Sequence, residues 1–187
     1  MITRLATSTK LFLLGLCLSA SVSAASLEYD RVVITLSDNG QILLDANIRY
    51  EFNDTIREAL EHGVPLVFET HIELREAGSW IWSKDVIEHR WRTSLRYRPL
   101  SRLYEVGDFK GAEKKSFATL RSAMEALGGI EEMAIIERAK LDPSEEYKVR
   151  LQISLDIEAL PLPMRPKAYV SADWNLASEP WEWLIKP

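Results

Sequence analysis

Residues 145–158 constrain the fold more than any other part of the chain, because six apolar side chains occupy every second position there. Side chains of a β-strand point to opposite faces in turn, so this pattern predicts a strand with one buried and one solvated face. Residues 42–52 repeat the pattern after a predicted turn at 38–40. A three-residue loop there places Leu36 opposite Ile42, so that the apolar side chains of both strands share one face. Strands with one polar face are typical of antiparallel sheets.

A second, longer hairpin is predicted to turn at residues 77–78 and to pair Phe68 with Ile87. In that register the polar side chains of its two strands lie on the same face of the sheet. The next turn along the chain is expected to place Tyr104 near Leu95.

Two short helices are predicted, one beginning at Asn53 or Asp54 and the other running from Ser116 to a stop at Gly128. Residues 130–141 fit a strand or a helix equally well. The proline-rich stretch after the last alternating segment cannot lie inside a sheet, and the tail beyond it is expected to pack back irregularly. The sum is an α+β fold of mostly antiparallel strands, as a sandwich or one strongly curled sheet, with two short helices.

The N-terminus has the features of a secretory signal. Arg4 and Lys10 precede a short apolar run over 11–20, which is followed by small residues up to Ala24. The run is well below the ~20 residues needed to span a bilayer. Cleavage after Ala24 or the next alanine is therefore expected, with export to the periplasm. Residues 1–24 would be the signal peptide, and 25–187 a single β-rich globular domain.

The mature chain has no cysteine, since Cys17 leaves with the signal, so it must fold without disulfides. About 160 residues can bury a sufficient core for that. Loss of the signal lowers Lys+Arg from 23 to 21 against 28 Asp+Glu, a mature charge of −7. Because an acidic surface repels phosphate backbones, nucleic-acid binding is not expected. No later segment is apolar enough to cross a membrane, so we expect a soluble protein.

The search for catalytic motifs finds no glycine-rich phosphate loop, GxSxG elbow or HExxH. The sequence leaves open a catalytic triad whose residues come from segments far apart in the chain. Glu69, His71 and Glu73 line one strand face and offer weak capture of zinc or calcium, but a solvated polar face is the favoured interpretation, since zinc sites usually need three or four convergent ligands. We therefore expect neither a metal site nor a cofactor.

The arginine row, Arg90, Arg92, Arg96 and Arg98, occupies alternate positions of one predicted strand. The row extends over eight residue steps, roughly 26 Å at 3.3 Å per residue, which suits an extended anionic partner better than a small ligand. The alternative is a solvated charge ladder in which Glu105, Asp156 and other acids pair with the arginines. In the predicted register Glu105 lies between Arg92 and Arg96.

Tryptophans occur in two W-x-W pairs, Trp80 with Trp82 and Trp181 with Trp183. In an extended chain each pair projects from one side of its strand. The first pair either forms an aromatic platform for a glycan, lipid or partner peptide, or is buried under the C-terminal tail.

Several stretches, among them "NDTIREALEHGVPLVFETHIEL", "RTSLRYRPLSRLYEV", "YKVRLQISLDIEALPLPMRP" and "DWNLAS", resemble an exported bacterial family catalogued as a domain of unknown function, DUF 4390. The resemblance covers nearly the whole mature chain. It implies export to the periplasm and assigns no activity and no site residue.

These features favour a non-catalytic interaction or accessory protein of the cell envelope. Its partner would be an envelope protein with an acidic surface, bound through the arginine row, Trp80 and Trp82. An alternative is a periplasmic binder of a lipid or other apolar small ligand between sheet and helices. A third, less favoured, is an envelope hydrolase.

Overall fold

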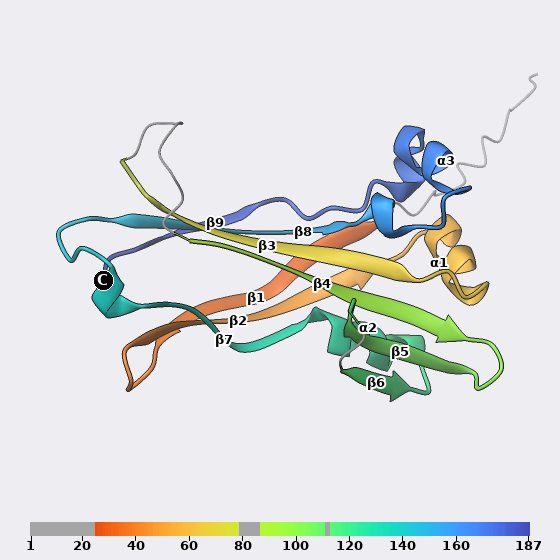
Figure 1. Cartoon of the computed structure of the whole chain (residues 1–187), viewed down its shortest axis with the longest axis horizontal. Coiled ribbons are helices and arrows are strands. Elements are labelled where there is room, and N and C mark those ends of the chain that lie inside the picture. Colours follow the sequence, from red (N-terminus) through yellow and green to blue (C-terminus); the bar gives the residue numbers. More distant parts are fainter. Residues whose placement is uncertain (1–24, 79–86, 111–112) are drawn as a thin grey trace, which may run out of the picture.

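The structure is a computed structural model that describes residues 25–78, 87–110 and 113–187. Its strands form two antiparallel sheets that pack as layers (Figure 1). The three-stranded sheet has the order β1 (Ser26–Leu36), β2 (Gln41–Glu51), β7 (Gly129–Glu137). The six-stranded sheet has the order β6 (Lys114–Phe117), β5 (Leu103–Asp108), β4 (Ile87–Arg98), β3 (Leu66–Glu76), β8 (Tyr147–Leu155), β9 (Trp181–Ile185).

The predicted α+β fold with mostly antiparallel strands is confirmed, in the sandwich form rather than as one curled sheet. A third short helix, α3 (Arg165–Val170), joins the two predicted ones, α1 (Asp54–Glu61) and α2 (Leu120–Gly128). The proline-rich stretch forms the turn that leads into α3, as the missing backbone donors required.

The core lies between the layers, where the apolar residues of the alternating strands meet. Phe68, Ile72, Leu151 and Leu44 are each no more than 1% exposed. The Tyr50 ring meets the Phe68 ring edge to face, with centroids 4.9 Å apart. This arrangement of aromatic rings adds a favourable electrostatic contact to the burial of apolar area.

The first hairpin has the predicted register. Leu36 lies opposite Ile42, and Gly40 adopts the left-handed conformation with φ +80°. The ambiguous residues 130–141 contribute β7, which pairs with the free side of β2 and is followed by a short 3-10 turn.

The predicted register of the second hairpin is wrong by six residues. Phe68 lies opposite Thr93, and Leu74 opposite Ile87. The observed register pairs the fully buried Leu66 with the fully buried Leu95, which a two-residue turn cannot do. Because the error is an even number, each described side chain of the two strands stays on its predicted face.

The next pairing is wrong by two residues for the same reason, a longer turn than predicted. Val106, not Tyr104, lies opposite Leu95, and Tyr104 instead faces Tyr97 with ring centroids 4.8 Å apart. The turn contains Arg102 at φ 55°, a left-handed conformation that the sequence does not signal with a glycine.

Helix α1 begins where it was predicted to begin, whereas α2 begins later than predicted. Asn53 caps α1, accepting a hydrogen bond from the Ile56 backbone N–H at 2.9 Å. α2 begins at Leu120 rather than Ser116, because Ser116 belongs to β6. Its end at Gly128 is correct, and a Cβ there would lie 2.0 Å from the Ile48 carbonyl oxygen of β2, so only glycine fits.

The C-terminal tail is partly regular. Between α3 and β9 it is irregular, as predicted, apart from a 3-10 turn at Ala172–Trp174 and one isolated bridge from Ala177 to Ser154. It then ends as β9, an edge strand paired with β8, which the prediction of an irregular tail missed.

Candidate functional site

The candidate site is the outer face of the six-stranded sheet, meaning the side chains of β3, β4 and β8 that point away from the core. β3 contributes Glu69, His71 and Glu73 to it, and β4 contributes Glu88 and the arginine row. Each of these residues alternates with a neighbour that faces inward. The even register error kept this face intact, so the sequence assigned its members correctly.

Three of the four arginines form ion pairs on this face. Arg90 Nη2 lies 2.5 Å from Glu88 Oε1, and Arg92 Nε donates a 2.9 Å hydrogen bond to Glu69 Oε2. Arg92 also lies 3.3 Å from Asp156 Oδ2. The structure therefore shows Asp156, one of the expected competitors, beside the row.

At the far end of the row, Arg98 Nε donates to Glu105 Oε2 at 2.8 Å. In register Glu105 lies opposite Arg96, yet its carboxylate turns to Arg98. Arg96 is exposed and forms no ion pair with any other residue of the described ranges. It is the arginine of the row whose charge stays available to a partner.

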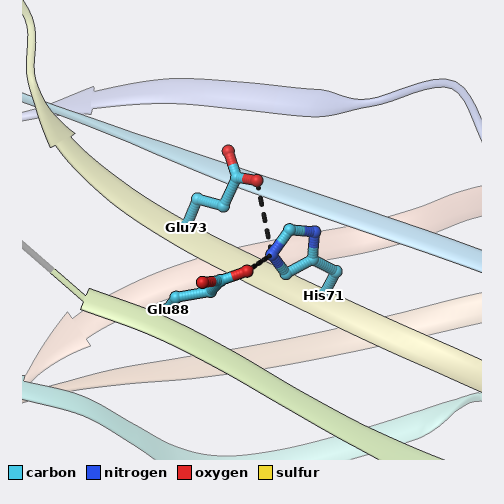
Figure 2. Close-up of side chains that lie close together, drawn as sticks. All are labelled: His71, Glu73 and Glu88. Carbon is cyan, nitrogen blue, oxygen red and sulfur yellow. Dashed lines mark hydrogen bonds and ion pairs between the residues drawn. The ribbon is translucent and has the colours of Figure 1, made fainter. Parts of the chain in front are cut away.

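A compact cluster of three side chains occupies the other end of the face (Figure 2). His71 Nε2 lies 2.9 Å from Glu88 Oε1 and 3.3 Å from Glu73 Oε1. One donor atom from each residue falls within 4.8 Å of the other two. An imidazole nitrogen and two carboxylate oxygens are ligands that zinc accepts in proteins.

Arginines already neutralise this cluster. Arg75 Nη2 lies 3.1 Å from Glu73 Oε2, and Arg90 lies on the Glu88 oxygen that contacts the imidazole. A divalent cation would therefore compete with Arg75 and Arg90 for the two carboxylates. The arrangement is that of an ion-pair network.

Sequence reasoning missed Glu88 as a member of the cluster. The predicted motif grouped Glu69 with His71 and Glu73, but Glu69 binds Arg92. Glu88 comes from the neighbouring strand, and the wrong register hid its position opposite Glu73. A register chosen to place opposite charges across the hairpin, such as Glu69 opposite Arg92, would have revealed its position.

The ion pairs shift the titration of these groups. The hydrogen bond from Arg90 lowers the pKa of Glu88, helped by the charge of Arg90 and by His71 and opposed by desolvation. The hydrogen bond to Glu69 raises the pKa of Arg92, and the charge of Asp156 adds to that rise. Both shifts favour the charged forms.

Of the two predicted tryptophan pairs, the structure describes one. Trp80 and Trp82 lie outside the described residues. Trp181 and Trp183 project from the same side of β9, with ring centroids 4.3 Å apart and both rings half-buried. Trp183 lies opposite Val149 and packs against the core.

Open clefts lie away from the outer face. One of about 290 Å³ is lined by Ile34, Leu36, Ile42 and Ile185 beside Arg138 and Lys186. Another of about 400 Å³ separates α1 from the turn before α3, with Val64, Met164, Trp174 and Lys167 among its walls.

A family model described as "Domain of unknown function (DUF4390)" matches residues 24–184. No curated protein and no solved structure matches the chain. Among the described residues, no helix combines the length and the apolar character that crossing a bilayer requires.

Proposed function

The chain belongs to the DUF4390 family, as its motifs predicted, and from that premise we propose that it is an exported, non-catalytic interaction module of the cell envelope. Its partner is an envelope protein that presents an acidic surface. The binding surface is the outer face of the six-stranded sheet, with Arg96 as the charge that contacts the partner.

The observation that carries the proposal is the uneven pairing of the arginine row. Arg90, Arg92 and Arg98 are held by carboxylates of the same face, whereas Arg96 is exposed without an ion pair among the described residues. An arginine without a partner keeps its full capacity for bidentate recognition of a carboxylate. The neighbouring pairs hold the rest of the row in place around it.

The engagement of the histidines supports a non-catalytic role. Nδ1 of His62 contacts the Glu58 carbonyl at 2.7 Å, His71 contacts two glutamates, and His89 Nε2 contacts the Ile135 carbonyl at 3.2 Å. General-base catalysis on a serine needs a histidine within hydrogen-bond reach of the hydroxyl. Within the part of the chain that the structure describes, the three histidines contact carbonyls and carboxylates and no serine hydroxyl.

Charge reversal at Arg96 tests the proposal. Partners captured from periplasmic extract by wild type are identified, purified and titrated against wild type, Arg96→Glu and Arg121→Glu. Arg121 is the matched control, an exposed arginine of α2 that also has no ion pair among the described residues. Arg96→Glu should weaken binding at least tenfold, because reversal adds repulsion to the lost contact.

Arg121→Glu should stay within about twofold of wild type, since it changes the net charge equally but lies off the outer face. Equal losses for the two variants would reduce the effect to net charge and contradict the assignment of Arg96. Arg92→Glu is a poorer probe, because it would also remove an ion-pair partner from Glu69 and from Asp156.

A second candidate, a binder of a lipid or other apolar small ligand, is favoured by the aliphatic cleft at Ile34, Leu36, Ile42 and Ile185. Arg138 and Lys186 beside it suit an anionic head group. Native mass spectrometry of the purified protein distinguishes this function, since a bound ligand adds a discrete mass that a Leu36→Asp variant should lose.

A further inference from the structure

The turn before α3 and α3 itself expose a stripe of large apolar side chains. Leu162, Tyr169 and Val170 are 72%, 59% and 86% exposed. In α3 the exposed Pro166, Tyr169 and Val170 have the i, i+3, i+4 spacing of one helix face, and Leu162 lies in the turn just before the helix. Isolated surface leucines are ordinary, but these large apolar side chains are exposed within nine consecutive residues.

The opposite side of α3 and of the preceding turn packs against the rest of the protein, which holds the apolar side chains in their exposed positions. Ala168 is 2% exposed, and Met164 packs against the core. Arg165 Nε donates to the Leu160 carbonyl at 2.8 Å, and the Tyr169 hydroxyl donates to Glu158 at 3.0 Å. Figure 1 shows α3 standing out from the sheet layers at one end of the molecule.

The charge of the stretch differs from that of the chain. Residues 159–172 contain Arg165 and Lys167 and no acid, in a chain with 28 Asp and Glu. The acids that flank the stretch accept hydrogen bonds from it: Glu158 from the Tyr169 hydroxyl, and Asp173 from the Ser171 hydroxyl at 3.2 Å. Across the adjacent cleft, α1 contributes Glu58 and His62 opposite Lys167.

We infer that this end of the molecule docks on the surface of a phospholipid bilayer. Leu162, Tyr169 and Val170 would enter the interfacial region, while Arg165 and Lys167 lie at the level of the head groups. Apolar side chains supply the larger part of such binding, and each cation near an anionic surface adds to it. Tyrosine is enriched at this depth because its ring is apolar and its hydroxyl polar.

The shape and size of the stripe favour a bilayer over a second copy of the chain. The stripe stands out from the body of the molecule, whereas a protein partner would need a matching groove. Stable interfaces bury about 800 Å² on each partner, far more than three side chains offer. A bilayer imposes no such threshold, because lipid closes around whatever side chains enter it.

The position of β1 agrees with a bilayer at this end. Ser26 pairs with Glu51, and two residues later the Asn53 amide donates to the Asp173 carbonyl beside α3. Ala20, the last residue of the predicted signal's apolar run, precedes Ser26 by six positions. Six residues span at most ~20 Å, so export would bring α3 close to lipid before the signal is removed.

Vesicle co-sedimentation of the purified mature protein tests the inference. Wild type is mixed with vesicles of phosphatidylcholine alone, or of phosphatidylcholine with phosphatidylglycerol, at about 1 mM lipid. The variants are Leu162→Asp/Val170→Asp, Lys167→Glu, and Leu184→Asp as the matched control. Leu184 is an exposed leucine, 55% accessible, in β9 near the C-terminus, at the end of the molecule away from α3 (Figure 1).

Wild type should bind both vesicle types, and the anionic one more tightly. Leu162→Asp/Val170→Asp should lose at least tenfold in lipid affinity on both, because two carboxylates replace the inserting side chains. Lys167→Glu should remove the preference for anionic vesicles while keeping most binding to phosphatidylcholine. Leu184→Asp should bind as wild type does.

No binding by wild type, or equal binding by the double variant, would overturn the inference. So would a wild-type dimer in light scattering that Leu162→Asp/Val170→Asp dissociates, since the occupant would then be a second copy. Because the substituted side chains are exposed, circular dichroism should show unchanged folding for every variant. The result is independent of Arg96, so it separates this inference from the proposed function.

Discussion

The two faces of β3 differ in what they contribute, although their residues alternate along one strand. Phe68 faces the core and is 1% exposed, while the side chain of the next residue, Glu69, is 26% exposed and binds Arg92. Burial of an aromatic ring is worth several kcal/mol, whereas ion pairs near a surface contribute about 0–1 kcal/mol. The inner face therefore stabilises the fold, and the outer face can vary its charges for recognition at little cost.

Truncation of the inner face should produce the largest effect. Phe68→Ala should lower the free energy of unfolding by about 3–5 kcal/mol, because it removes a buried ring and leaves a cavity beside Tyr50 and Phe52. Urea denaturation followed by circular dichroism measures the change. Glu69→Ala, the adjacent residue on the outer face, is the control and should cost about 1 kcal/mol or less. Similar losses for the two would contradict the division between the faces.

The same division explains which parts of the fold could be predicted from sequence. Alternation fixes the face of each side chain, and this survives a register error of six residues in one hairpin and of two in the next. Register itself depends on loop length, and neither Ala77-Gly78 nor the turn at Arg102 carries a strong length signal. The start of α2 could not be predicted, because Ser116 pairs with Glu105 of β5 and therefore belongs to a strand.

The site was predictable in its face but less so in its contacts. The arginine row, and Asp156 and Glu105 as its competitors, followed from parity. The choice of Glu105 between Arg96 and Arg98 depends on side-chain rotamers, which periodicity does not encode. Glu88 joined His71 only through the correct register. Whether Trp80 and Trp82 are covered stays a prediction, because they lie outside the described residues.

The coupling between Glu69 and Arg92 should be much smaller than the effect at Phe68. A double-mutant cycle with Glu69→Ala and Arg92→Ala should give a coupling energy of about 0.2–1 kcal/mol, since the Arg92 side chain is 45% exposed and water screens the pair. Added salt should reduce it. The matched cycle of Glu69→Ala with Arg96→Ala should give a coupling near zero. A value as large for Arg96 as for Arg92 would show that the row acts as a whole.

The smallest expected effect concerns titration at the cluster around His71. Glu88 has a pKa below its ordinary value, chiefly because Arg90 donates a hydrogen bond to it. A carboxyl with a lowered pKa in the folded state stabilises that state above its unfolded pKa, and this contribution is lost as pH falls through the folded value. Arg90→Ala should therefore raise the pKa of Glu88 towards its ordinary value and reduce the loss of stability on acidification.

The carboxyl ¹³C shift of Glu88, followed from neutral to acidic pH in wild type, Arg90→Ala and Arg98→Ala, measures this change. Arg98 is the matched control, because it pairs with Glu105 at the far end of the row. Its removal should leave the titration of Glu88 as in wild type. An unchanged Glu88 midpoint in Arg90→Ala would contradict the assignment of the lowered pKa to Arg90 and would leave the contact with His71 as its cause.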